Sequence, residues 1–172
     1  MITSEQFQRI VPALPIMQGA DPAIIQAFQQ AAFITRISAG KDVFNEGDDV
    51  EAIALMISGV VRVYKIGETG REITLYRFGL GHSCILTANA ILTRQSLPAI
   101  ATVEREVEEV MIPANTFCEC LRRSDLWRAF VYDLLSQRLV SMMEIVDEVA
   151  FRRMDSRVAS VLLFRSQMNN PS

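Results

Sequence analysis

The hydrophobic pattern of the chain changes near residue 113. Before that point, short segments rich in β-branched and aromatic residues recur between glycine-containing turns, a pattern typical of antiparallel strands. After that point, apolar residues recur at helical spacing, and no glycine follows Gly81. The pattern therefore predicts an α+β protein in which a β-sheet region precedes a helical C-terminal part.

Glycine positions divide the first part into strands. Seven of the eight glycines lie between Gly40 and Gly81, and the segment 67–70 is a strong hairpin tip. A later strand is predicted where Glu104, Glu106 and Glu108 alternate with valines, because period two is typical of a half-buried strand. The predicted strands are Phe33–Ile37, Val43–Phe44, Ala52–Ile57, Val60–Ile66, Glu72–Phe78 and a last one that ends at Ile112.

Helices are predicted on both sides of the strands. Asp21 followed by Pro22 is a typical helix start, with an N-cap acid before a proline in the first turn. A short helix is predicted to begin at Pro113 and to carry Phe117 and Leu121. A final helix is predicted over about 154–165.

The segment 125–151 has the pattern of one long helix. Its apolar residues cover about half of the circumference, which is wider than the stripe of a one-sided surface helix. Such a helix needs two surfaces to pack against, and we expect the β-region to supply one and a second copy of the chain the other. The alternative is that the helix crosses a larger core. The candidate interface residues are Trp127, Val131, Leu134, Leu135, Leu139, Met142, Ile145, Val146 and Val149.

Composition excludes several classes of protein. The 172 residues are 50% hydrophobic and carry a net charge of −3, from 17 basic and 20 acidic side chains. This balance argues against a segment that grips a phosphate backbone, which needs a concentrated basic face. The N-terminus lacks the basic and apolar regions of a signal peptide, and no apolar run is long enough to span a membrane. We therefore expect a cytoplasmic globular protein without membrane contact.

The glycines of the strand region stand at fixed offsets from apolar positions. This order closely resembles the cyclic nucleotide-binding domain superfamily, and the long helix after it resembles the Crp/Fnr family of bacterial transcription regulators. Glycines form the corners of such a tight β-roll, and alternating apolar residues fill its interior. The matching residues are Gly40, Val43, Phe44, Gly47, Asp48, Leu55, Ile57, Gly59, Val61 and Val63.

The resemblance implies a division of the chain into three parts. Residues 1–123 would form an effector-sensing antiparallel β-roll, jelly-roll-like, with flanking helices, and residues 124–153 a dimerisation helix. Residues 154–172 would form the hinge and first helix that lead toward a winged helix-turn-helix, which this sequence does not contain. The resemblance thus implies a homodimer that contacts DNA only through that further domain. The alternative is a stand-alone module for binding a ligand or a protein.

The effector cassette departs from the pattern of family members that bind cyclic AMP. Those members carry Gly-Glu at its start and Arg-Ser or Arg-Thr, then Ala, at its end, so that an acid holds the ribose and an arginine the phosphate. Here the first pair is Gly81-His82, and Leu97-Pro98 stands at the second position. We therefore expect a small-molecule effector other than cyclic AMP. The candidate contacts are Gly81, His82, Ser83, Arg94, Pro98 and Ala99. For Arg94, the only cation inside the cassette, the alternative is a solvated loop arginine.

Other cofactors have little support in the sequence. His82 is the sole histidine, and because the family includes haem-based sensors it is a candidate for a haem ligand, with a hydrogen-bonded histidine at a strand start as the alternative. The cysteine cluster of the iron–sulfur members is missing ahead of Cys84, so we expect no such cluster and no other metal site. Cys84 lies in an apolar run and fits a small buried residue. No nucleophile, histidine pair or phosphate-binding glycine loop indicates an enzyme.

Overall fold

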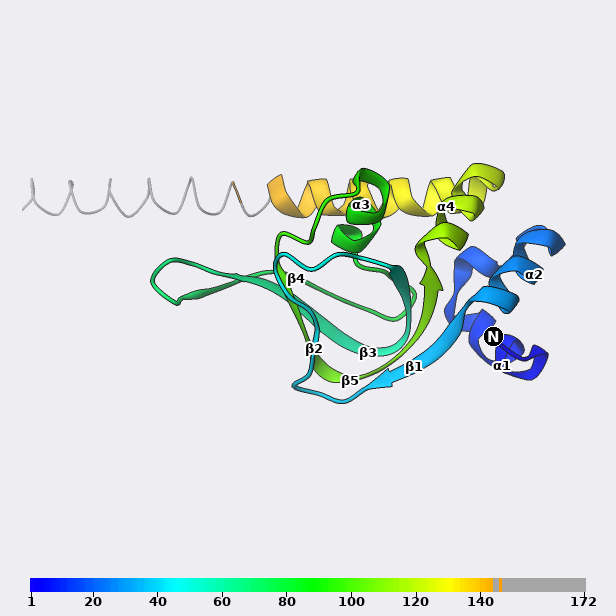
Figure 1. Ribbon diagram of the computed structural model, residues 1–172, viewed down its shortest axis with the longest axis horizontal. Helices are drawn as coiled ribbons and strands as arrows, with labels where there is room; N and C mark the ends of the chain where they lie inside the picture. The colour runs from blue at the N-terminus through cyan, green and yellow to red at the C-terminus, as the bar shows by residue number, and fades with distance from the viewer. Residues whose placement is uncertain (144–145, 147–172) are drawn as a thin grey trace, which may run out of the picture. The chain divides into compact units, whose positions relative to one another are not determined.

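The computed structural model describes residues 1–143 and 146, and five antiparallel strands form its central sheet (Figure 1). The last strand, β5, pairs with three others, so it forms the spine of the sheet. The path of neighbours runs β1-β5-β3-β4, and β2 pairs with β5. The strands are β1 (Phe33–Ile37), β2 (Asp42–Phe44), β3 (Ala52–Ile66), β4 (Glu72–Gly79) and β5 (Ile100–Pro113).

The prediction of two separate strands on either side of Gly59 is wrong, because β3 is continuous there. The register of β3 against β5 shifts around Ser58 and Val60, so the strand carries a bulge. Before the bulge, Met56 points into the cluster that fills the roll, whereas after it Val61 and Val63 do. The residues that face the roll interior therefore have even numbers before Gly59 and odd numbers after it. Because the alternation restarts at Gly59, the sequence of this one strand has the pattern of two strands.

Helices flank the sheet. Those ahead of it are α1 (Ser4–Ile10), two 3-10 turns (Val11–Ala13 and Pro15–Met17) and α2 (Pro22–Ala31), and Figure 1 shows α1 and α2 gathered at one end of the sheet. Later come α3 (Ile85–Thr93), α4 (Ala114–Arg123) and a helical stretch over 125–143. None of the described helices is long and apolar enough to cross a bilayer.

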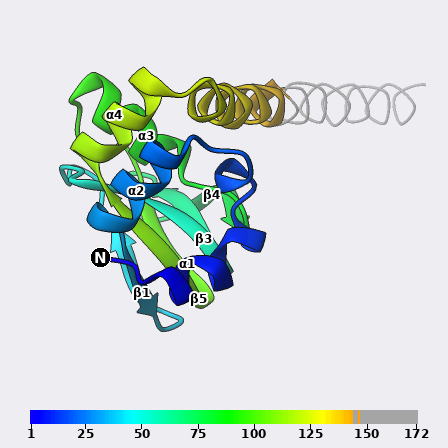
Figure 2. The same cartoon turned by 90° about the vertical axis from the view of Figure 1, so that its right-hand side faces the viewer.

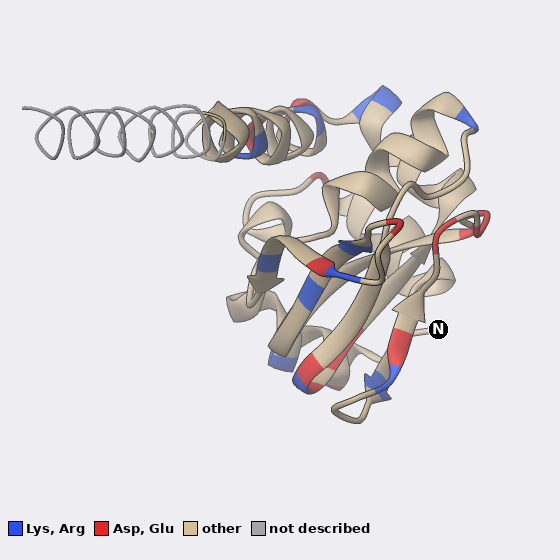
Figure 3. Cartoon of the chain, turned by 90° about the vertical axis from the view of Figure 1, so that its left-hand side faces the viewer, with Lys and Arg blue, Asp and Glu red and all other residues tan. Residues whose placement is uncertain are grey.

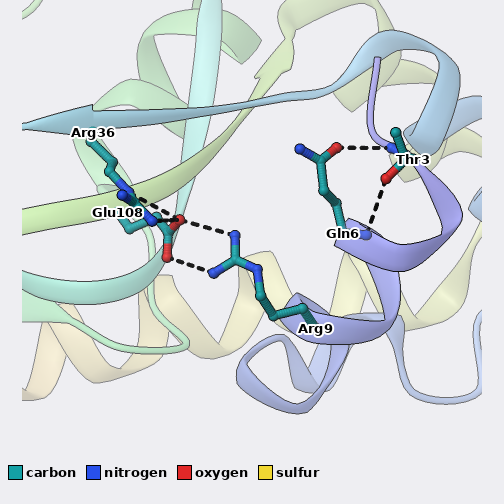
Figure 4. Close-up of polar contacts among 5 residues, drawn as sticks. All are labelled: Thr3, Gln6, Arg9, Arg36 and Glu108. Atoms are coloured by element: carbon teal, nitrogen blue, oxygen red, sulfur yellow. Dashed lines mark hydrogen bonds and ion pairs between the residues drawn. The ribbon is translucent and has the colours of Figure 1, made fainter.

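The helix starts follow from local capping. The carboxylate of Asp21 accepts a hydrogen bond of 2.8 Å from the Ala23 N–H, which confirms the predicted start of α2. The start of α1 was not predicted. There, the hydroxyl of Thr3 accepts from the Gln6 N–H and the Gln6 side chain accepts from the Thr3 N–H, a reciprocal capping box (Figure 4).

Two buried clusters occupy the two faces of β5. Val110 and Ile112 lie in a cluster with residues of α1, α2 and α4, the helices drawn over the sheet in Figure 2. Val103 and Val107 belong to the second cluster, which fills the interior of the roll. Since side chains alternate along a strand, β5 separates the helical layer from the roll interior.

The chain divides into two compact units, with a boundary between Leu134 and Leu135. The division at 123 and 153 stays a prediction. The final helix predicted at 154–165 lies outside the described residues.

Candidate ligand-binding site

A cavity of about 470 Å³ opens at the rim of the roll, within the size range of sites for small molecules. Its walls come from β2, the loop that follows it, the start of β3, the end of β4, the segment around α3, and β5. Most of the lining is apolar, and aromatic rings contribute on two sides. The lining residues are Val43, Phe44, Asp48, Asp49, Val50, Glu51, Ala52, Ala54, Phe78, Cys84, Thr87, Leu97, Glu109 and Met111.

Hydrogen bonds to backbone carbonyls attach both ends of the α3 segment to the walls of this cavity. At the start of the segment, the hydroxyl of Ser83 donates to the Ala54 carbonyl at 2.6 Å. At its end, the Leu97 N–H donates to the Asp48 carbonyl at 2.9 Å, and the Gly47 N–H donates to the Leu97 carbonyl at 2.8 Å. The segment therefore spans the cavity as a strap between two anchors.

Glu109 is the buried ionisable group of the cavity. Strand alternation places it with Val107 and Met111 on the roll side of β5, and its side chain is 2% exposed. The Thr35 hydroxyl donates to Oε1 of Glu109 at 3.2 Å. Burial raises the pKa of the Glu109 carboxyl above its usual range, and the Thr35 hydrogen bond opposes that rise.

The charges around the cavity have one sign. Asp48, Asp49 and Glu51 are exposed at its edge, and together with buried Glu109 they bring four carboxyl groups to the site. No lysine or arginine occurs among the described lining residues. Elsewhere the two signs are mixed, as the strands and loops in Figure 3 show. The site therefore disfavours an anion and favours a neutral or positively charged ligand.

Cys84 contributes a neutral thiol to the cavity wall. Its side chain is buried, as predicted, and Sγ lies 3.2 Å from the hydroxyl of Tyr76. Burial raises the pKa of the Cys84 thiol, so the reactive thiolate is disfavoured. Within the described part of the chain, no three potential ligands gather to hold a metal ion.

The sequence candidates at the start of the cassette form a turn rather than a wall. The Gly81 N–H donates to the Met56 carbonyl at 2.9 Å, and the His82 carbonyl accepts from the Met56 N–H at 3.0 Å. The His82 side chain is exposed and is not among the lining residues. A haem bound there would have no enclosed apolar pocket among the described residues, so the site does not fit that cofactor.

The candidates at the other end also lie outside the lining. Arg94 ends α3 in the left-handed conformation, with φ of 56°, and its side chain is exposed, as is that of Pro98. Ala99 is buried in the roll cluster, and Ser83 serves as an anchor of the strap. The six candidates therefore keep only a predicted role in binding.

The residues that line the cavity were missed for identifiable reasons. Cys84, Thr87 and Leu97 lie within or next to the predicted cassette, but their side chains offered no charge to single them out. Glu109 did carry a signal. Along β5, Glu109 lies on the same face as Val103 and Val107. The alternation predicts an apolar side chain on that face, so an acid there indicates an unusual environment.

The candidate interface residues fall into two groups. Trp127, Val131 and Leu134 are buried in the protomer's own helical cluster, and the Trp127 ring lies 6.0 Å from that of Phe117. A second group is exposed, with exposed fractions of 44 to 64%. It consists of Leu135, Leu139, Met142 and Val146. Ile145 and Val149 lie outside the described residues.

Comparison with known proteins identifies the fold. The pattern of the family described as "Cyclic nucleotide-binding domain" matches residues 34–124, more than half of the chain. Among solved structures, a transcriptional regulator of the Crp/Fnr family from Eubacterium rectale is similar, with a TM-score of 0.74 and 24% identity. The match covers 91% of this chain and 73% of that one.

Curated relatives match over different shares of their length. The global nitrogen regulator of Synechococcus elongatus is 27% identical over 76% of this chain, and the match spans 59% of that protein. A lysophospholipase of Phaeosphaeria nodorum is 26% identical over 56% of this chain, but the match spans only 6% of that protein. The chain thus covers about six tenths of the regulator and a small part of the lipase.

Proposed function

Because the chain belongs to the cyclic nucleotide-binding domain family, we propose that it is the sensor and dimerisation part of a Crp/Fnr-like transcription regulator whose effector is not cyclic AMP. The fold shared with the Eubacterium rectale regulator supports the assignment to a Crp/Fnr-like regulator. The two global nitrogen regulators match 76% and 84% of this chain. The lysophospholipases match 56% and 64% of it, but through only 6% and 7% of their own length, so we assign the chain no catalytic step.

The charge of the cavity is the observation that carries the choice of effector. A cyclic nucleotide brings a negatively charged phosphate, which proteins hold with arginines and backbone N–H groups. The cavity instead offers four carboxyl groups, and Pro98 has no N–H to donate where the cyclic AMP pattern expects a donor. A cyclic phosphate placed here would lose its hydration without gaining a cation.

The position of α3 gives a route from the cavity to the C-terminal helix. Cys84 and Thr87 line the cavity, whereas Ile85 and Ala88 of the same segment lie in the buried cluster that contains Trp127 and Val131. A ligand that displaces α3 therefore changes the packing available to the first turns of that helix. Such a shift between two packings is the switch that we propose for the sensor.

The exposed apolar residues of the C-terminal helix support dimerisation. Leu135, Leu139, Met142 and Val146 follow a four-three-four spacing, which is the repeat of a coiled-coil seam. Apolar side chains at this spacing are stabilised by burial against an identical helix.

Sedimentation velocity tests the proposal on the whole chain. We expect one species with the mass of two chains over about 1 to 100 μM, a range that corresponds to binding free energies of roughly −8 to −5 kcal/mol. A single species with the mass of one chain over this whole range would contradict the dimeric sensor.

A further inference from the structure

The chemistry of the cavity goes beyond excluding cyclic AMP. We propose that it binds a small, largely apolar molecule with a protonated amine, and that the buried carboxylate of Glu109 receives the amine. This inference rests on the proposed function, because it specifies the effector class of the same site.

Glu109 has accepting capacity that the protein does not use. A carboxylate accepts about four hydrogen bonds. Thr35 donates to Oε1, and Oε2 has no hydrogen-bond partner among the described residues. The side chain is nevertheless 2% exposed and lines the cavity. Because the carboxylate lines the cavity, a ligand there is placed to donate a hydrogen bond to Oε2.

Two other buried side chains of the lining, those of Thr87 and Cys84, are already engaged. The Thr87 hydroxyl donates to the Cys84 carbonyl at 2.7 Å, and the Cys84 sulfur lies 3.2 Å from the Tyr76 hydroxyl. These two side chains therefore present mainly a methyl group and a sulfur to the cavity. Glu109 is left as the buried polar anchor, since the other three carboxyl groups, those of Asp48, Asp49 and Glu51, belong to exposed residues at the edge.

The rest of the lining describes the body of the ligand. Phe44, Phe78 and Leu97 are apolar, and Val50 and Met111 extend the same surface. A volume of about 470 Å³ is large enough for a fused aromatic ring with a short side chain. Apolar walls with one oriented polar group are the usual design of a small-molecule site, since the walls provide affinity and the polar group fixes orientation.

Electrostatics favours a cation over a neutral donor. Burial raises the pKa of Glu109, and no positively charged group of the described residues contributes to offset that rise. An ammonium group beside the carboxylate provides such a charge. The exposed carboxyls of Asp48, Asp49 and Glu51 at the edge of the cavity add an attraction that salt screens.

A series of three indoles that differ in charge tests the inference by calorimetry on the native chain. Tryptamine is a cation, 3-ethylindole is neutral, and indole-3-propionate is an anion, while the ring is the same. We expect tryptamine to bind saturably and at least about tenfold more tightly than indole-3-propionate, with 3-ethylindole between them. A tenfold difference corresponds to about 1.4 kcal/mol.

A matched pair of variants assigns the preference to Glu109. Glu109→Gln keeps the size of the side chain and removes its charge, so we expect it to remove most of the difference between tryptamine and indole-3-propionate. Glu68→Gln makes the same chemical change in the exposed turn between β3 and β4, away from the cavity, and is expected to leave that difference as it is in the native chain.

The outcomes separate this inference from the proposed function. Equal binding of tryptamine and indole-3-propionate, tighter binding of the anion, or no binding of tryptamine would overturn the amine proposal, even if the chain is dimeric and does not bind cyclic AMP. Unchanged charge preference in Glu109→Gln would overturn the role of Glu109. If that variant does not fold, the three indoles measured on the native chain still decide whether the cavity prefers an amine.

Discussion

Arg9 and Glu108 are joined by two hydrogen bonds of 2.9 Å, although 99 positions separate them in the chain (Figure 4). The Arg36 side chain donates to Oε1 of the same carboxylate at 3.0 Å. Glu108 therefore ties α1 to β5 and β1 at once. The hydrogen bond from Arg9 is the largest cause that lowers the pKa of Glu108, and Arg36 adds to it.

This connection predicts a stability loss that depends on pH. A carboxyl whose pKa is lower in the folded than in the unfolded chain stabilises the fold above the unfolded value, about 4.3 for Glu, and this contribution is lost as the pH falls through the lowered folded value. We expect Glu108→Gln to lower the thermal midpoint at pH 7, modestly because the Arg9 side chain is half exposed. As the pH falls below the lowered folded pKa, the midpoints of the two proteins should converge.

Glu119→Gln is the control for this measurement. It removes an exposed ion pair with Arg123 inside α4, whose contribution should be small at every pH. A loss at pH 7 that is as small for Glu108→Gln as for Glu119→Gln would contradict the structural role of Glu108.

The neighbouring residue Glu109 should show the opposite pH dependence. Its folded pKa is raised, so its contribution is present below the unfolded value of about 4.3 and is lost as the pH rises through the folded pKa. We expect Glu109→Gln to be more stable than the native chain at pH 8 and to lose this advantage toward pH 4. Urea unfolding across that range measures it. A variant that is less stable than the native chain at pH 8 would show that the charge at Glu109 is compensated within the protein.

Gly59 should be far less tolerant of alanine than Gly47. Both have a positive φ, 89° and 91°, and a Cβ there costs about 1 to 2 kcal/mol of conformational strain. At Gly59 the Cβ would also lie 2.2 Å from the Glu106 carbonyl oxygen, whereas at Gly47 nothing lies within 4 Å. We expect Gly59→Ala to lower the unfolding free energy by about 1 to 3 kcal/mol more than Gly47→Ala does. Equal losses would argue against the bulge.

The proposed dimer seam predicts the effect of a charge on the C-terminal helix. Leu139→Glu places a carboxylate in the seam, where burial against a second helix leaves it unpaired, so the dissociation constant of the dimer should rise at least about tenfold. Ser136→Glu adds the same charge at an exposed position outside the four-three-four spacing, so it should change the dissociation constant of the dimer little. Sedimentation equilibrium compares the two. A similar effect of both changes would point to net charge rather than to the seam.

The sequence predicted the sheet well because each strand keeps a regular alternation between turns that need glycine. It failed at β3, where the bulge at Gly59 exchanges the inward and outward positions, and the exchange depends on contact with the β5 backbone at Glu106. Such a contact joins distant residues and leaves no local pattern.

The cavity was less predictable than the fold. The resemblance directed attention to the charged and turn positions of the cassette, such as His82 and Arg94, whose side chains are exposed. The lining instead combines Cys84, Thr87 and Leu97, which lie in or next to α3, with Glu109 from a strand that comes later in the chain. The acid at a position where the strand alternation predicts an apolar residue was visible in the sequence, but only the fold shows that it lines the same cavity as Cys84 and Thr87.

Calorimetric titration of the whole chain with cyclic AMP tests the central claim most directly. The acidic cavity without arginine or lysine predicts no saturable heat up to about 1 mM ligand, a concentration at which sites weaker than about −4 kcal/mol stay largely empty. Saturable binding with a dissociation constant in the micromolar range would contradict the account, because it would require a phosphate site that the described cavity does not provide.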